Sequence, residues 1–272
     1  MNILVTLNEA YIPCLEVMLR SLADCTPGQF FSVYLIETSV RDEALDRARR
    51  ILGENGEIIR VNVADNELIR SLADAPTTSR YPTEIYYRIF AAKLLPETLD
   101  RILYLDPDLI VNRSIAGLYS TDMDGYMFAA ASHVRRLMQK VNEKRLDMDE
   151  SDPYINSGVM LMNLRKLRAE QNVGDVYDFI EEHRRSLVLP DQDIISGLYG
   201  EDILPLDPYR YNMTERLFAL RLLTSHKMSV DWVRENSAVI HYCGRNKPWR
   251  PGYIGMLDIF WNETAAKISG IR

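Results

Sequence analysis

The stretch ILYLDPDLIV, at residues 102–111, is an apolar run interrupted by two aspartates with a proline between them. Because its residues are apolar at successive positions, we expect a strand that is buried on both faces of a sheet. Such strands are typical of parallel sheets that helices cover on both sides. The stretch therefore predicts an α/β fold with two carboxylates at the tip of a central strand.

Strand-like and helix-like segments alternate around this stretch. The expected strands are 2–7, 31–38, 57–63, 101–106, 126–132, 154–164 and 238–244, and the expected helices are 11–23, 40–53, 83–95, 172–187 and 191–200. This alternation predicts an open, Rossmann-like, doubly wound and mostly parallel sheet with helices on both faces. Ligands of such sheets bind beyond the carboxyl ends of the strands, which is where the two aspartates lie.

The composition excludes several classes of protein. The 272 residues carry a formal net charge of -7, which argues against broad nucleic-acid binding. Three widely spaced cysteines form neither a disulfide framework nor a cysteine-based zinc site. The first residues resemble a strand rather than a signal peptide, and no apolar run is long enough to span a bilayer. We expect a cytoplasmic protein with at most weak peripheral contact at the inner face of the membrane.

The aspartate pair, Asp106 and Asp108, has two interpretations. Two carboxylates this close repel each other unless a cation lies between them, and a hard divalent ion such as Mn²⁺ or Mg²⁺ prefers oxygen ligands. Asp-Pro-Asp is also ordinary turn chemistry. The phosphatases of the haloacid dehalogenase class offer a third interpretation, since they too end a strand in Asp-x-Asp, but that motif normally lies near the N-terminus.

Two further stretches favour the metal. HYCGRNKPW, at residues 241–249, places His241 after an apolar strand, where a neutral imidazole would suit Mn²⁺ as a third ligand. Gly244 allows a close approach to a ligand, and Lys247 adds the positive charge that a diphosphate needs. YINSGVMLMNL, at residues 154–164, sets polar residues within an apolar strand, where an amide could bind sugar hydroxyls or satisfy a bulge.

Four motifs together carry a resemblance to a known family. They are YLDPDLIV, YINSGVMLMNLRKLR, LPDQDIISGLYG and HYCGRNKPW, in this order along the chain. The sequence resembles glycosyltransferase family 8, which includes glycogenin and bacterial lipooligosaccharide α-galactosyl- and α-glucosyltransferases, from about residue 1 to about residue 250. The resemblance implies the GT-A fold and a retaining transferase that uses a UDP-sugar and a divalent metal, usually Mn²⁺.

The resemblance also implies a role for particular residues. Asp106, Asp108 and His241 would ligate the metal, with Gly244 and Lys247 holding the phosphates. The turn VTLNEAY would bind the nucleoside, and the helix containing IYYRI would reach the donor with its arginine. The residues implied there are Thr6, Asn8, Tyr11 and Arg88 for the donor nucleotide, Asn156 and Ser157 for the donor sugar, and Asp191 and Gln192 as catalytic residues beside that sugar.

The implied reaction moves a hexose from a UDP-sugar to a glycan or lipid-linked glycan acceptor. Two departures from the family pattern bear on the donor: Asn8 replaces an aspartate of the uracil-binding turn, and His133 stands where galactosyltransferases carry an aspartate, so galactose and glucose both remain open. Retention could proceed by double displacement through Asp191 or by front-face substitution, and we favour the second. A UDP-sugar-binding protein without turnover is the remaining alternative.

The resemblance further suggests how the chain is divided. Residues 1–250 would form one domain, with a nucleotide-binding half at 1–110 and a donor-sugar and acceptor half at 111–250. Residues 251–272 would form a C-terminal helical tail that docks on this domain.

Overall fold

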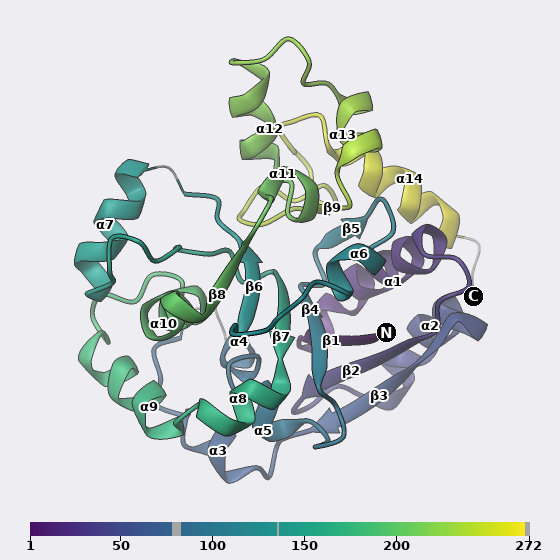
Figure 1. Ribbon diagram of the computed structural model, residues 1–272. Coiled ribbons are helices and arrows are strands. Elements are labelled where there is room, and N and C mark those ends of the chain that lie inside the picture. Colours follow the sequence, from purple (N-terminus) through teal and green to yellow (C-terminus); the bar gives the residue numbers. More distant parts are fainter. Residues whose placement is uncertain (78–82, 135, 270–272) are drawn as a thin grey trace.

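The computed structural model describes residues 1–77, 83–134 and 136–269, and its centre is a seven-stranded sheet (Figure 1). The strand order is β3-β2-β1-β4-β7-β6-β8. These strands are β1 (Asn2–Thr6), β2 (Phe31–Glu37), β3 (Gly56–Asn62), β4 (Arg101–Leu105), β6 (Phe128–Ala131), β7 (Val159–Asn163) and β8 (Ile203–Leu206). A separate two-stranded sheet joins β5 (Leu109–Val111) to β9 (Val239–His241).

The large sheet is mostly parallel, as the sequence predicts. Strands β1 to β4 pair in parallel, and β6 pairs in parallel with β8. Strand β7 runs against both of its neighbours, β4 and β6. The reversal brings the start of β7 to the edge where β1 and β4 end, so the polar residues that precede β7 face the carboxyl ends of the parallel strands.

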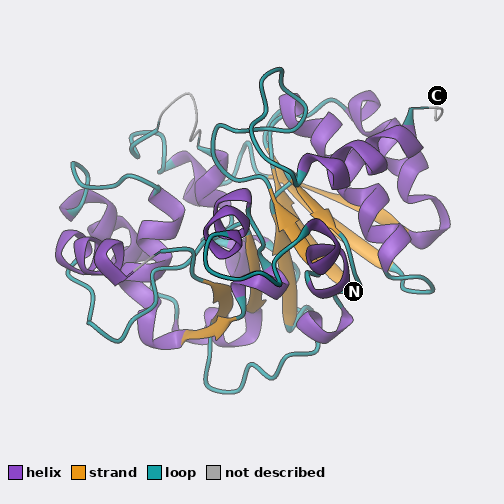
Figure 2. Ribbon diagram, turned by 90° about the horizontal axis from the view of Figure 1, so that it is seen from above, coloured by secondary structure: helices purple, strands orange, loops and turns teal. Residues whose placement is uncertain are grey.

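Helices cover both faces of the sheet (Figure 2). They are α1 (Ile12–Cys25), α2 (Asp46–Leu52), α3 (Glu67–Arg70), α4 (Glu84–Tyr87), α5 (Ala91–Leu94), α6 (Ala116–Tyr119), α7 (Arg136–Leu146), α8 (Leu164–Glu170), α9 (Val173–Glu182), α10 (Pro190–Tyr199), α11 (Pro208–Tyr211), α12 (Glu215–Leu222), α13 (Val230–Asn236) and α14 (Asp258–Ile268). No helix of the described residues has the length and apolarity that crossing a bilayer requires.

Two hydrophobic cores form on the two faces because successive side chains of a strand point to opposite sides. In β4, Leu103 and Leu105 pack into a core that includes residues of α1, α2 and α14. Ile102 and Tyr104 pack into a second core with residues of α5, α8, α9 and α10. The expectation that this strand is buried on both faces is thus confirmed. In the C-terminal segment, α14 packs on the first core through Phe260 and Trp261. The final residues, 270–272, lie outside the described part of the chain.

Several expected elements differ from those observed, and the strand expected at 238–244 is the shorter β9 of the small sheet. Two further differences have a cause in the structure. The helix expected at 83–95 is divided into α4 and α5, because Ile89, Phe90 and Ala91 bond back three residues instead of four. The side chain of Gln171 also donates to the carbonyl of Ile89 at 2.9 Å, which removes that carbonyl from the helical ladder. The strand expected at 154–164 begins only at Val159, because the residues before it turn into the site described below.

The contact between α9 and α10 supplies a test of the packing. A Cβ on Gly197 of α10 would lie 2.4 Å from Cζ of Phe179 on α9. We expect Gly197→Ala to destabilise the protein by about 1–3 kcal/mol, since overpacking outweighs the gain of about 1 kcal/mol in helix propensity. Urea denaturation would measure the change in the free energy of unfolding.

Gly117 on α6 provides the matched control. A Cβ there would meet its nearest neighbour, the hydroxyl of Tyr211, at an ordinary 3.8 Å. Gly117→Ala should therefore be neutral or slightly stabilising. Equal stability of the two variants would contradict the close approach of α9 to α10.

Candidate functional site

A pocket of about 770 Å³ lies beyond the carboxyl ends of β1 and β4. Every residue that the sequence analysis selected for the site lines it, although these residues come from segments spread over most of the chain. They are Thr6, Asn8, Tyr11, Arg88, Asp106, Asp108, Asn156, Ser157, Asp191, Gln192, His241, Gly244 and Lys247. The structure thus brings these residues together at one place, and their individual roles remain predictions.

The turn after β4 places the two aspartates. The chain leaves the large sheet at Leu105, and Asp106 stays attached to it through a backbone N–H that donates to the carbonyl of Gly158 at 2.8 Å. After the turn, β5 pairs with β9 in the small sheet, and Leu109 lies opposite His241. The carboxylates therefore meet because the chain changes sheets between them, and the register of the small sheet brings the histidine beside them.

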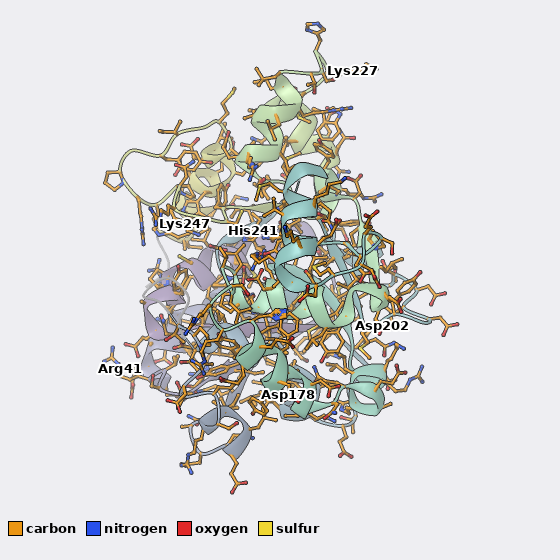
Figure 3. All side chains as sticks on the ribbon, turned by 90° about the vertical axis from the view of Figure 1, so that its left-hand side faces the viewer. Arg41, Asp178, Asp202, Lys227, His241 and Lys247 are labelled. Carbon is orange, nitrogen blue, oxygen red and sulfur yellow. The ribbon has the colours of Figure 1, made fainter. Side chains whose placement is uncertain are left out.

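Three side chains converge on one point. Each of Asp106, Asp108 and His241 offers an atom within 4.8 Å of the others (Figure 3 labels His241). Nε2 of His241 lies 3.2 Å from Oδ1 of Asp108 and 3.5 Å from Oδ2 of Asp106. Among the described residues, this Nε2 and the Oδ1 of Asp108 are buried without a hydrogen-bond partner. A buried carboxylate oxygen and imidazole nitrogen aimed at one point fit a divalent cation such as Mn²⁺ or Mg²⁺.

Gly158 makes room for this arrangement. A Cβ at Gly158 would lie 2.2 Å from Cε1 of His241 and 2.6 Å from Oδ2 of Asp106. Any larger residue would displace two of the three candidate ligands. The glycine of the stretch YINSGVMLMNL therefore serves the site by the absence of a side chain, which the sequence analysis did not foresee.

Two buried cations offset the negative charge of the turn. Nη1 of Arg88 lies 3.0 Å from Asp106 and 3.1 Å from Asp191, and Lys247 forms an ion pair with Asp108. Burial by itself raises the pKa of each aspartate of the turn, but the charge of Arg88 beside Asp106 and that of Lys247 beside Asp108 hold both pKa values below the ordinary range. Both carboxylates are therefore ionised at neutral pH.

His241 responds to the same two carboxylates. Burial lowers its pKa, but the carboxylates of Asp106 and Asp108, which lie within 3.5 Å of Nε2, outweigh that effect and raise the pKa to about 10. Without a metal, the imidazole is therefore protonated at neutral pH. The point between the carboxylates thus attracts positive charge, and a cation held there would take the place of the proton on Nε2.

Polar side chains at the start of α10 form the opposite wall. The hydroxyl of Ser157 donates to Oδ2 of Asp191 at 2.7 Å, and the amide of Asn156 donates to Oε1 of Gln192 at 2.8 Å. Both α10 residues are less than a tenth exposed. Burial raises the pKa of Asp191 despite the charge of Arg88. These groups offer carboxylate and amide functions to a polyhydroxylated ligand.

A further wall of the pocket is formed by the end of β1 and the turn after it. The hydroxyl of Thr6 lies 3.3 Å from that of Tyr104, and the ring of Tyr11 is half-buried at the pocket. Oδ1 of Asn8 is buried and has no hydrogen-bond partner among the described residues. It is an unused acceptor for a donor group of a bound ligand. Gly244 has a φ of 90°, which few residues other than glycine adopt.

Several residues of the site escaped the sequence analysis. The hydroxyl of Tyr104 donates to Asp106 at 2.6 Å, and its place two residues earlier on the same strand was an available signal. Asn212, which has no exposed surface, accepts from Nδ1 of His241 at 3.0 Å through Oδ1. No local pattern marks that contact, because it joins residues 29 positions apart. Nε2 of His133, which lines the pocket, lies 2.8 Å from the carbonyl of Asn212.

Comparison with known proteins places the chain among glycosyltransferases. The family model for glycosyl transferase family 8 matches residues 2–251. A lipopolysaccharide 1,2-glucosyltransferase of Escherichia coli is 24% identical over 248 residues, which cover 89% of this chain and 71% of that protein. General stress protein A of Bacillus subtilis is 27% identical over 224 residues, which cover 80% of this chain and 76% of the other.

The fold is likewise shared with solved structures. The galactosyltransferase LgtC, crystallised with donor and acceptor sugar analogues, matches with a TM-score of 0.82 and 21% identity over 100% of this chain and 98% of its own. This likeness confirms the GT-A fold that the sequence analysis expected. Since the family model covers nearly the whole chain, the protein belongs to glycosyltransferase family 8.

Proposed function

We propose that this protein is a retaining transferase that moves galactose or glucose from a UDP-sugar to a glycan or lipid-linked glycan acceptor. The observation that carries the proposal is the convergence of Asp106, Asp108 and His241, with two buried atoms that lack hydrogen-bond partners in the part of the chain that the structure describes. When bound there, Mn²⁺, or Mg²⁺ in its place, would act as a Lewis acid that neutralises the departing diphosphate. Membership of the family favours this reaction over phosphate-ester hydrolysis.

The surrounding groups support a division of labour within the pocket. Lys247 is buried beside the proposed metal site and can add positive charge next to the diphosphate. The unpartnered Oδ1 of Asn8 suits the N–H of a uracil, and the ring of Tyr11 offers a surface on which a base can stack. Asn156 and Gln192 would then face the sugar.

Front-face substitution fits the state of the two residues proposed as catalytic. Oδ2 of Asp191 accepts from Ser157 and pairs with Arg88, while Oε1 of Gln192 accepts from Asn156. Both groups are engaged in holding the wall of the pocket, so we assign them to orienting the sugar rather than to attack. In this mechanism the acceptor hydroxyl attacks on the face that the diphosphate leaves, and an oxygen of the diphosphate takes the proton.

UDP release is the experiment that tests the proposal. UDP-galactose, UDP-glucose and UDP-N-acetylglucosamine are each incubated with the protein, in Mn²⁺ or in EDTA. We expect release from UDP-galactose or UDP-glucose in Mn²⁺, and at least a hundredfold less in EDTA, since the departing charge would then lack its cation. Binding of UDP without release from any donor would instead indicate a nucleotide-sugar-binding protein.

Substitution of a single carboxylate tests the metal site. Asp106→Asn and Asp108→Asn each remove a charged ligand while preserving size, and each should lower Mn²⁺-dependent turnover by at least a hundredfold in a folded protein. Steady-state kinetics and circular dichroism measure the two effects. Asp178→Asn, on the exposed side of α9, should leave turnover unchanged (Figure 3). Near-normal turnover of either site variant would refute the assignment.

Cysteine reactivity tests where the nucleotide binds. Cys243 is exposed at the pocket beside Gly244, whereas burial raises the pKa of Cys14 to about 12 and keeps it a thiol at pH 8. A thiol reagent should therefore modify Cys243 in the native protein and leave Cys14 intact. UDP with Mn²⁺ should slow modification of Cys243 at least fivefold, as peptide mass spectrometry would show. If saturating nucleotide left the modification rate of Cys243 unchanged, the nucleotide would bind elsewhere.

A further inference from the structure

Asn212 connects the two sides of the pocket from behind. Its Oδ1 accepts from Nδ1 of His241 at 3.0 Å, and its Nδ2 donates to Oδ1 of Asn156 at 2.9 Å. The residue has no exposed surface and is not among those that line the pocket. It can therefore reach neither nucleotide nor sugar directly, although it contacts a residue of each wall.

The orientation of this amide follows from its neighbours. Oδ1 of Asn156 also accepts from the backbone N–H of Gly158 at 3.3 Å. Because a backbone N–H can only donate, the oxygen of Asn156 faces Gly158 and Asn212 together. Asn212 must then present its NH₂ group to Asn156, which turns its own oxygen toward His241.

The hydrogen bonds continue in the same direction to α10. Asn156 donates to Oε1 of Gln192 at 2.8 Å, since its own oxygen is already turned to Gly158 and Asn212. The next residue of α10, Asp193, is anchored by the hydroxyl of Tyr154. That hydroxyl donates to Oδ1 of Asp193 at 2.7 Å. Asp193 has no exposed surface and binds Arg145 through two hydrogen bonds of 2.7 and 2.8 Å, so its carboxylate only accepts.

The three hydrogen bonds that run from His241 through Asn212 and Asn156 to Gln192 thus all have the same direction. The one between His241 and Asn212 determines which nitrogen of the imidazole is protonated. An oxygen of Asn212 can only accept, so Nδ1 of His241 carries a proton. The lone pair of Nε2 is then the one available to a cation, and it lies between the two carboxylates. A metal ligand of this kind needs its other ring nitrogen held by a fixed acceptor.

We propose that Asn212 is a positioning residue that holds His241 with Nδ1 protonated and Nε2 directed at the cation, and that ties this ligand to the amide wall on the sugar side. The inference rests on the metal site of the proposed function. It adds that the metal side and the sugar side, which Arg88 joins through Asp106 and Asp191, are also joined through the buried amide of Asn212, so a change at Asn212 should affect both.

Two substitutions separate these two tasks. Asn212→Leu keeps the branching of the side chain at Cγ, in a somewhat larger side chain, but can neither accept from His241 nor donate to Asn156. Asn212→Asp can still accept from His241 but cannot donate to Asn156. The probe is Mn²⁺ alone, titrated into the full chain and followed by the electron paramagnetic resonance of the free ion, so that the readout does not depend on turnover.

We expect Asn212→Leu to weaken Mn²⁺ binding about 10- to 100-fold, the usual effect of losing the partner of a ligating histidine. Asn212→Asp should keep the Mn²⁺ affinity within about threefold of the wild type. Its kcat at saturating Mn²⁺ should nevertheless fall about tenfold or more, because the wall formed by Asn156 and Gln192 loses its support. Asn212→Ala replaces the leucine variant should that variant fail to fold.

Asn163→Leu is the control for loss of stability alone. Asn163 lies at the opposite end of β7 from the pocket and donates to the carbonyls of Met123 and Tyr126 at 3.3 and 3.2 Å. The Asn163→Leu variant should have a lower melting temperature than the wild type and the same affinity for Mn²⁺.

Three results would overturn the inference. In the first, Asn212→Leu binds Mn²⁺ as the wild type does while melting early like the control, which would make the residue merely structural. In the second, the leucine and aspartate variants bind Mn²⁺ equally weakly, which would exclude the role of the acceptor. In the third, the wild-type protein itself binds no Mn²⁺, which would first refute the metal site of the proposed function.

Discussion

The site depends on the burial of two carboxylates within one three-residue turn. Burying ionised groups is unfavourable unless each is paired, so Asp106 and Asp108 require compensation from elsewhere. It comes from Arg88, His241 and Lys247, which belong to segments far apart in the chain. The charge balance of one turn therefore fixes where the segment after α4, the end of β9 and the following loop must lie.

Compensation within the protein is nevertheless incomplete. Oδ1 of Asp108 and Nε2 of His241 stay buried without a hydrogen bond in the described structure, a state that is unfavourable in most proteins. Gly158 preserves it, since any side chain there would push the histidine and Asp106 away. A site that keeps such an unfavourable state is typical of one that binds a ligand.

The fold of the first half of the chain and the residues that line the site could be predicted from the sequence, because both rest on local patterns. Asp106 and Asp108 were recognisable because an apolar strand stops at polar residues. HYCGRNKPW was recognisable for the same reason, since its histidine also follows an apolar strand. The break between α4 and α5 was not recognisable, since Gln171, distant in sequence, captures a helical carbonyl. The reversal of β7 and the contact of Asn212 with His241 likewise depend on how remote segments pair, which periodicity does not encode.

A transferase that retains configuration by front-face substitution has to hold the diphosphate and the sugar separately while keeping the distance between them constant. On the proposed function, the turn after β4 and the loop after β9 hold the diphosphate, and the start of α10 holds the sugar. Two links between these walls are the backbone hydrogen bond from Asp106 to Gly158 and the ion pairs of Arg88 with Asp106 and Asp191. The buried amides of Asn156 and Asn212 add a further link, in a direction set by the backbone N–H of Gly158. A water in place of either amide could bridge the same groups, but it would fix neither the direction of the hydrogen bonds nor the spacing that the reaction needs.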